Sequence, residues 1–200
     1  MGKVLDALDD NLAEVVSRQP VFFVATAPAG ADGHVNVSPK GTSGTFAVLD
    51  PRTVAYLDLT GSGIETIAHL RENGRITLMF CTFEGPPLIV RLHGRGEPVL
   101  PGDERFPRLL DAFPEQADAP GIRSVIVVDV ERVSTSCGYS VPLMDYREDR
   151  QVLRRWSERK GPDGIAAYWR QKNGASIDGL PGLPDAPGRR RARDRPAATG

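Results

Sequence analysis

The segment GSGIETIAHL (61–70) places two glycines and two hydroxyl side chains at the expected start of a helix. The first N–H groups of a helix have no partner within it, and the helix dipole favours a negative charge there. Together with the hydroxyls of Ser62 and Thr66, these amides could bind a phosphate group. The segment is not a Walker loop, because it lacks Gly-Lys-Ser/Thr, nor GxGxxG, because Thr66 follows Gly61 and Gly63. An ordinary turn capped by Ser62 is the alternative interpretation.

A second candidate is Lys40, in the run Ser38-Pro39-Lys40-Gly41 at the end of an expected strand. The neighbouring proline and glycine restrict the backbone, so the ammonium group could point into a cleft and donate a hydrogen bond to a carbonyl or a ring nitrogen. A lysine in a solvated turn is the alternative interpretation.

Other reactive residue types do not form a recognisable set. The spacing of His34, His69 and His93 matches no metal triad, so structural or surface roles are expected. Arg91 and Arg95 share a strand face with His93, and one of them could contact an anion; a solvated face is the alternative. No GxSxG pattern occurs, and no catalytic residue is predicted. The two cysteines are far apart and lack CxxC spacing, which favours reduced thiols and no zinc site.

The amino-acid composition indicates a globular protein and argues against some kinds of partner. The 200 residues are 40% apolar and 26% charged, which is typical of a globular chain. A net charge of −1 argues against a nucleic-acid-binding protein held by phosphate contacts. Five Arg and two Asp fall in residues 185–200, so segment 184–200 is predicted to be a disordered Arg-rich tail. Without a signal peptide or an apolar run long enough for a membrane span, a cytoplasmic location is expected.

The elements that must position these residues alternate with turn signals. Two hairpins are expected over 21–41 and 46–59, and helix 61–73 should stop at Asn73-Gly74. The other predicted elements are a helix over 4–18, strands over 75–83, 88–100 and 122–133, a helix over 103–113, and a helix over 151–173 interrupted at Gly161-Pro162. Short turns between successive strands favour a mainly β (α+β) fold, a six-stranded antiparallel barrel with an inserted helix, an N-terminal helix and a C-terminal helical extension.

The order of three segments resembles the pyridoxamine 5′-phosphate oxidase superfamily of FMN-binding split barrels. These segments are VNVSPKG, TVAYLDLTGSGIETIAHLRENGRITLMF and IVRLHGRGEPV, and the likeness covers about residues 10–135. Residues 135–183 resemble a bacterial branch of the superfamily rather than the vitamin B6 enzymes. The resemblance implies an FMN-binding barrel domain over 1–135, with a C-terminal extension over 136–183 packed on it.

The resemblance also implies which residues contact the cofactor. Strand residues Val37, Ser38, Pro39 and Lys40 would lie beside the isoalloxazine, and Thr60 would lie near the ribityl-phosphate. The remaining implied contacts are Gly61, Ser62, Thr66, Arg91 and Tyr139. Glu65 and Thr66 replace an Arg and a Lys that hold the phosphate in the B6 oxidases, so Glu65 is expected to point elsewhere. Ile89 stands where the family often has a flavin-contacting Gln, while Arg91 remains. The sequence has no clear equivalent of the late tryptophan or of the substrate-binding Arg-x-His of the B6 oxidases, which counts against pyridoxamine phosphate as the substrate.

The expected function is that of a homodimeric, FMN-dependent oxidoreductase acting on a small molecule. In such barrels the flavin lies at the dimer interface, so a partner's Arg or Tyr139 could complete each site. Three alternatives stay open: an F420-dependent reductase, a haem-binding barrel with His93 or His69 as axial ligand, and a non-catalytic flavin-binding or stress-associated protein. Neither nucleic acid nor membrane is an expected partner.

Overall fold

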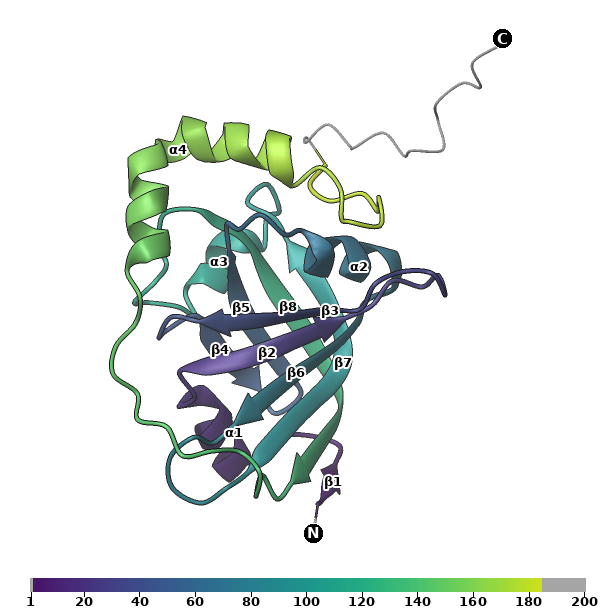
Figure 1. Ribbon diagram of the computed structural model, residues 1–200, viewed down its shortest axis with the longest axis vertical. Helices are drawn as coiled ribbons and strands as arrows, with labels where there is room; N and C mark the ends of the chain where they lie inside the picture. Colours follow the sequence, from purple (N-terminus) through teal and green to yellow (C-terminus); the bar gives the residue numbers. More distant parts are fainter. Residues whose placement is uncertain (1, 185–200) are drawn as a thin grey trace.

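The computed structural model describes residues 2–184, in which eight strands and four helices form a curled sheet with helices around it (Figure 1). The predicted Arg-rich tail falls, from residue 185 on, outside the described residues. The strands are β1 (Val4–Leu5), β2 (Val21–Thr26), β3 (Asn36–Gly41), β4 (Phe46–Asp50), β5 (Thr53–Leu59), β6 (Arg75–Cys81), β7 (Ile89–Val99) and β8 (Ile122–Ser136). The helices are α1 (Asp10–Ser17), α2 (Glu65–Asn73), α3 (Phe106–Leu110) and α4 (Val152–Lys172).

The sheet is an open antiparallel barrel. Seven strands follow the order β3-β2-β6-β7-β8-β5-β4, and each neighbouring pair is antiparallel. Within residues 2–184, the edge strands β3 and β4 do not pair with each other, so the barrel stays split along this seam. The predicted fold class is confirmed, whereas the predicted number of six strands is too low.

The N-terminal segment accounts for part of that difference. A helix was expected from residue 4, but Val4 and Leu5 pair with Ser134 and Val133 of β8. The helix begins only after Asp9, whose carboxylate accepts a hydrogen bond from the Leu12 amide at 2.8 Å. This side-chain cap satisfies an otherwise unpaired N–H group and fixes the helix start.

Alternating side chains fill the inside of the barrel. On β7, Val90 and Leu92 point inward and are buried, whereas Arg91 and His93 lie on the other face, as their spacing predicts. In Figure 1, α1 lies at the end of the barrel opposite α2, and its Leu12 joins the same buried cluster. Both ends of the barrel interior are therefore covered by helices.

Glycines end helix α2 and interrupt helix α4 at the positions predicted from the sequence. Helix α2 stops at Gly74, which adopts a left-handed conformation with φ 70°. Helix α4 is broken at Gly161, where φ is 63° and ψ is 173°, so it consists of two pieces. Between β8 and α4, residues 137–151 run along the side of the barrel (Figure 1), where the Met144 amide donates to the Phe83 carbonyl.

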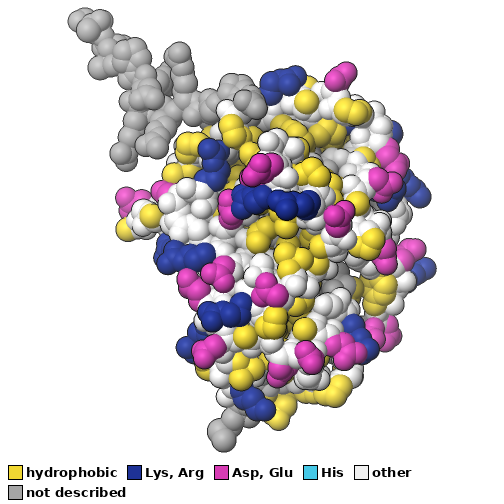
Figure 2. Space-filling model, turned by 180° about the vertical axis from the view of Figure 1, so that it is seen from behind, with side chains coloured by type: hydrophobic (Ala, Val, Ile, Leu, Met, Phe, Trp, Pro, Cys, Tyr) yellow, Lys and Arg dark blue, Asp and Glu magenta, His cyan; other side chains and the backbone are white. Residues whose placement is uncertain are grey.

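The outward face of β5 and β8 carries a second apolar cluster. Phe106 of α3 and the following Phe113 pack there against Leu57 and Val125. Figure 2 shows the molecule from behind, with Lys and Arg side chains interspersed among Asp and Glu side chains. No helix within residues 2–184 combines the length and apolar character needed to cross a membrane.

Candidate functional site

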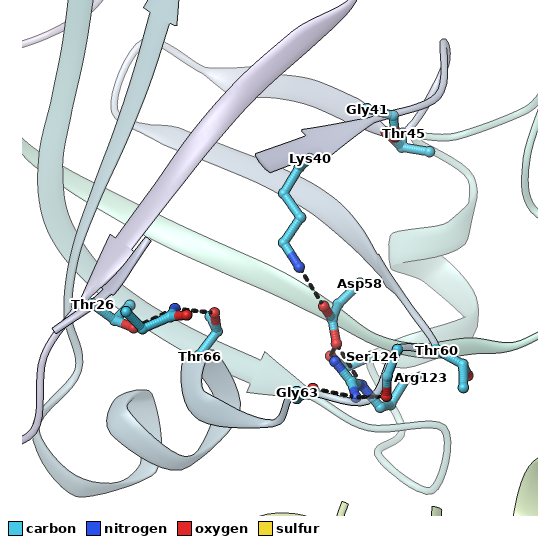
Figure 3. A network of polar contacts seen from close by, with 12 residues as sticks. Thr26, Lys40, Gly41, Thr45, Asp58, Thr60, Gly63, Thr66, Arg123 and Ser124 are labelled. Carbon is cyan, nitrogen blue, oxygen red and sulfur yellow. Dashed lines mark hydrogen bonds and ion pairs between the residues drawn. The ribbon is translucent and has the colours of Figure 1, made fainter. Parts of the chain in front are cut away.

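A buried carboxylate with two cations lies next to the turn that precedes α2 (Figure 3). Asp58 of β5 is fully buried and shares the barrel-facing side of its strand with Val54 and Tyr56. The Lys40 Nζ lies 3.0 Å from its Oδ1, and the Arg123 Nε lies 2.8 Å from its Oδ2. We call these three residues the charge cluster.

The charge cluster has a net charge of +1. Burial alone would raise the pKa of the Asp58 carboxyl, but the adjacent Arg123 and Lys40 outweigh it and lower that pKa to about 2. Asp58 is therefore ionised at neutral pH, and two positive charges face its single negative charge. The excess positive charge is located next to the turn that the sequence indicates as a phosphate site.

The carbonyl groups of that turn are held from one side. Arg123 Nη1 donates to the Gly63 carbonyl at 2.9 Å and to the Gly61 carbonyl at 3.3 Å. Asn173 Nδ2, at the end of α4, donates to the Gly61 carbonyl at 3.0 Å and to the Ser62 carbonyl at 3.4 Å. Three successive carbonyls thus point toward Arg123 and Asn173.

The amides of the same turn point the other way. In a trans peptide the N–H of the next residue is opposite to the C=O, so the amides of Ser62, Gly63 and Ile64 face away from Arg123 and Asn173. Within residues 2–184, no group accepts a hydrogen bond from these three amides. The alternative of a Ser62 cap is not realised, because the helix N-cap is Ile64 and makes no side-chain cap bond. Three unpaired donors at a helix start are suited to an anion.

A cavity of about 440 Å³ opens at this turn. One wall comes from residues 34–37 at the start of β3, another from Ser62, Gly63 and Glu65, and the third from Lys172 at the end of α4 with residues 175 and 177. The C-terminal extension thus contributes directly to the cavity. The residue types of the sequence had suggested an anion site only at the 61–66 turn.

The prediction that Glu65 points away from this turn is wrong. Its side chain lines the cavity, one carboxylate oxygen lies beside Gly63, and Oε1 accepts a hydrogen bond from the Ile177 amide at 3.1 Å. His34, which also lines the cavity, has its Nδ1 at 2.7 Å from Asp178 Oδ1, and this hydrogen bond lowers the pKa of the Asp178 carboxyl. Among the described residues that line the cavity, Lys172 is the one lysine or arginine.

The two predicted threonines lie at the turn, but their hydroxyls already have partners. Thr60 Oγ1 donates to the Gly121 carbonyl at 2.7 Å and accepts from the Trp169 indole at 2.9 Å. Thr66 Oγ1 accepts from the Asn36 side chain at 3.1 Å. Thr60 thus holds α4 in place, whereas Thr66 keeps its own hydroxyl proton available.

The predicted β3 residues divide between the two faces of the strand. Val37 and Pro39 are exposed, and Val37 lines the cavity. Ser38 and Lys40 are half-buried on the other face, where the Lys40 ammonium group reaches Asp58. Lys40 is therefore part of the charge cluster rather than a lysine in a solvated turn.

Arg91 and Tyr139 do not lie near the cavity of their own chain. Arg91 pairs with Ser134 of β8 and donates to Ser136 Oγ at 3.1 Å, whereas Asp58 pairs with Ser124. Ten residues separate these two points on β8, which corresponds to about 33 Å along the strand. Tyr139 lies beyond the end of β8 and is 81% exposed.

Four residues of this region were not predicted from the sequence: Asp58, Arg123, Lys172 and Asn173. Only Asp58 carried a local signal, since the period of two in β5 places it on the same face as Val54 and Tyr56. Within residues 2–184, no three His, Cys, Asp or Glu side chains gather closely enough to hold a metal ion.

These features define a class: an open antiparallel barrel with a helix inserted between two strands and an anion-suited cavity at the helix start. Residues 8–137 match the family model described as pyridoxamine 5′-phosphate oxidase. The chain is also 43% identical over 195 residues to the pyridoxamine 5′-phosphate oxidase family protein ustO of Aspergillus flavus, covering 90% of this chain and 78% of that protein. The chain belongs to the pyridoxamine 5′-phosphate oxidase family. The narrower resemblance to a bacterial branch stays a prediction.

Solved structures show more distant similarity. A FAD-binding protein from Mesorhizobium loti is 17% identical with a TM-score of 0.47, covering 68% of this chain and 96% of that chain. An FMN-binding protein from Syntrophomonas wolfei is 16% identical with a TM-score of 0.46, covering 70% of this chain and 90% of that chain. These similarities are too low to transfer a ligand to this chain.

Proposed function

We propose that the protein binds FMN and acts as an oxidoreductase on a small molecule. The observation that carries this proposal is the cavity at the start of α2, where the amides of Ser62, Gly63 and Ile64 have no acceptor within residues 2–184. A phosphate group would accept hydrogen bonds from such amides, and membership of the pyridoxamine 5′-phosphate oxidase family is consistent with a phosphorylated cofactor. FMN would supply the redox chemistry when bound.

The charge cluster favours a negatively charged ligand at the turn, and the Glu65 carboxylate beside Gly63 acts against it. The charge cluster adds +1 next to the turn, where burial weakens the screening by water. Arg123 has two roles in this arrangement, because it neutralises Asp58 and also orients the carbonyls of Gly61 and Gly63. The protein would therefore bind the phosphate through fixed backbone donors rather than through a pair of cations on α2.

A homodimer completes the proposed site. Val35 and Val37, next to the cavity, are 71% and 64% exposed, and β3 is an edge strand. A second copy packed against this edge would cover both side chains and the isoalloxazine ring. Arg91 and Tyr139, which are remote from the cavity of their own chain, would then be available to the flavin of the partner.

The absorption spectrum of the purified protein tests this proposal. We expect flavin absorption bands in the protein as isolated, or after addition of FMN followed by removal of the unbound cofactor. A colourless protein that binds no added FMN would refute the proposed function. Reduction of the bound flavin by NAD(P)H or by a candidate substrate would support the oxidoreductase role, whereas a flavin that none of them reduces would favour a non-catalytic flavin-binding protein.

An F420-dependent reductase and a haem-binding barrel would each give a distinct result in the same experiment. Preferential binding of F420 in a parallel reconstitution would favour the reductase. A Soret band would indicate haem. Both ring nitrogens of His93 have partners, in Thr77 and Ser134, whereas His69 Nδ1 lies 3.0 Å from Thr26 Oγ1 and its buried Nε2 has no partner within residues 2–184. No contact in the described part of the chain favours haem over FMN.

A further inference from the structure

We infer that Lys172 makes the cavity select a phosphorylated flavin over an unphosphorylated one, and that Glu65, which lines the same cavity, weakens this selection. This inference rests on the proposed function. Lys172 and Glu65 line the same cavity of about 440 Å³, together with Ser62 and Gly63 of the turn. The cavity therefore contains one cationic and one anionic side chain whose effects on a phosphate group must be opposite in sign.

Lys172 is brought to the cavity by its neighbours on α4. Asn173 is fully buried, and its side chain holds the Gly61 and Ser62 carbonyls. The Trp169 indole donates to Thr60 at 2.9 Å, which fixes the last turn of α4 against the same turn of the barrel. The backbone of Lys172 thus lies between two anchored residues.

The ammonium group of Lys172 is available for a ligand. In the described part of the chain it forms no ion pair, unlike Lys40, which is bound to Asp58. The turn itself, residues 60–66, contains no Lys or Arg. Lys172 is 106 residues away from Thr66 in sequence, yet it supplies the positive side chain that the turn lacks.

Glu65 acts in the opposite direction. One of its carboxylate oxygens is used by the Ile177 amide, while its charge remains in the cavity. Replacement by glutamine keeps an oxygen acceptor for that amide and removes only the charge. Glu65→Gln is therefore expected to increase FMN affinity without altering the wall of the cavity.

The test is to titrate the apo-protein with FMN and with riboflavin, which lacks the phosphate, and to measure both dissociation constants by flavin fluorescence. We expect Lys172→Gln to weaken FMN binding about fivefold, because a charge-assisted contact at an exposed side chain is lost, and to leave riboflavin binding unchanged. Glu65→Gln should strengthen FMN binding about threefold, again with riboflavin unchanged.

Arg170→Gln is the matched control. Arg170 is an exposed cation on the same turn of α4, but it does not belong to the residues that line the cavity. This variant should bind FMN like the wild type. Raising the ionic strength should reduce the FMN-to-riboflavin preference of the wild type and of Arg170→Gln, and should affect Lys172→Gln much less.

The outcomes separate this inference from the proposed function. If the wild type binds neither FMN nor riboflavin, the proposed function is wrong. If the wild type binds FMN but Lys172→Gln and Arg170→Gln bind it equally well, the proposed function stands and this inference is overturned. An equal loss of FMN and riboflavin binding in Lys172→Gln would show a structural role and would also overturn it.

Discussion

Asp58 carries a full negative charge inside the barrel because two cations reach it, Lys40 from the edge strand β3 and Arg123 from the adjacent strand β8. An unpaired buried carboxylate would lose its charge, since desolvation disfavours the ionised form. Lys40 and Arg123 reverse this effect, and Arg123 continues to the carbonyls of the 61–63 turn. The residue that stabilises the interior thus also determines how the proposed phosphate site is oriented.

Asp58→Asn should destabilise the protein by about 3–5 kcal/mol, because it leaves the two cations without their buried partner. Urea denaturation measures the free energy of unfolding of this variant. Asp129→Asn is a suitable control, since Asp129 is exposed on β8 and should change stability by less than about 0.5 kcal/mol. Equal stability of the two variants would contradict the role assigned to the charge cluster.

The same carboxylate predicts a pH dependence of stability. Its pKa is about 2 in the folded protein, whereas an unfolded Asp titrates near pH 3.9. Because the folded pKa is the lower one, the stabilisation is complete above about pH 4 and is lost as the pH falls toward 2. The free energy of unfolding of the wild type should decrease as the pH falls across this range. In Asp58→Asn this decrease should be smaller by about 2.5 kcal/mol. Identical pH profiles would refute the assignment.

At the scale of single elements, local patterns predicted most of the structure. Alternation on β7 gave the correct inward and outward faces, and Gly74 ended α2 as expected. The spacing of Val4 and Leu5 also fits a helix face, whereas their pairing with Ser134 and Val133 of β8 has no signature in the local sequence. Sequence reasoning therefore failed where a distant strand, rather than neighbouring residues, determined the conformation.

The candidate site shows the same limit. The residue types of the ten-residue segment 61–70 were enough to indicate the turn around Ser62 as a candidate phosphate site. Arg123 and Asn173, in contrast, contact Gly61 from 62 and 112 residues away. The spacing of residues along the chain does not show such contacts, because they depend on the curvature of the sheet and on the path of α4 back to the barrel.

The break in α4 gives a prediction at this scale. Gly161 has φ 63° and ψ 173°, a conformation that side chains with a Cβ rarely adopt, although a Cβ there would meet no atom within 4 Å. Gly161→Ala should therefore lower the stability of α4 by about 1–3 kcal/mol through backbone strain alone. Both tryptophans of the chain, Trp156 and Trp169, lie on α4, so urea denaturation followed by Trp fluorescence reports on this helix.

Gly102→Ala is the control for that experiment. A Cβ at Gly102 would also meet no atom within 4 Å, and its φ is not in the left-handed region. This variant should unfold like the wild type. If Gly161→Ala unfolds at the same urea concentration as Gly102→Ala, the break in α4 does not depend on glycine.

Over the whole molecule, the basic side chains do not form one continuous positive surface. The net charge is −1, and Figure 2 shows acidic and basic side chains mixed over one face. Such a mixture of charges produces no large electrostatic field of one sign around the molecule. The positive charges relevant to the proposed function are the charge cluster and Lys172.

The proposed dimer gives a prediction for the assembly. Val37→Asp places a charge on the exposed edge strand next to the cavity and should shift the protein from dimer to monomer, with weaker FMN binding. Sedimentation velocity measures the change in mass. Val152→Asp is the control, since Val152 is 71% exposed at the start of α4 and does not line the cavity. A wild-type protein that is monomeric and still binds FMN would contradict the proposed interface.

The decisive measurement is a crystal structure of the protein with FMN bound. We predict that the phosphate accepts hydrogen bonds from the amides of Ser62, Gly63 and Ile64, with Lys172 beside it and the ring covered by a second copy at β3. A phosphate bound elsewhere, with these three amides still unpaired, would contradict the proposed site.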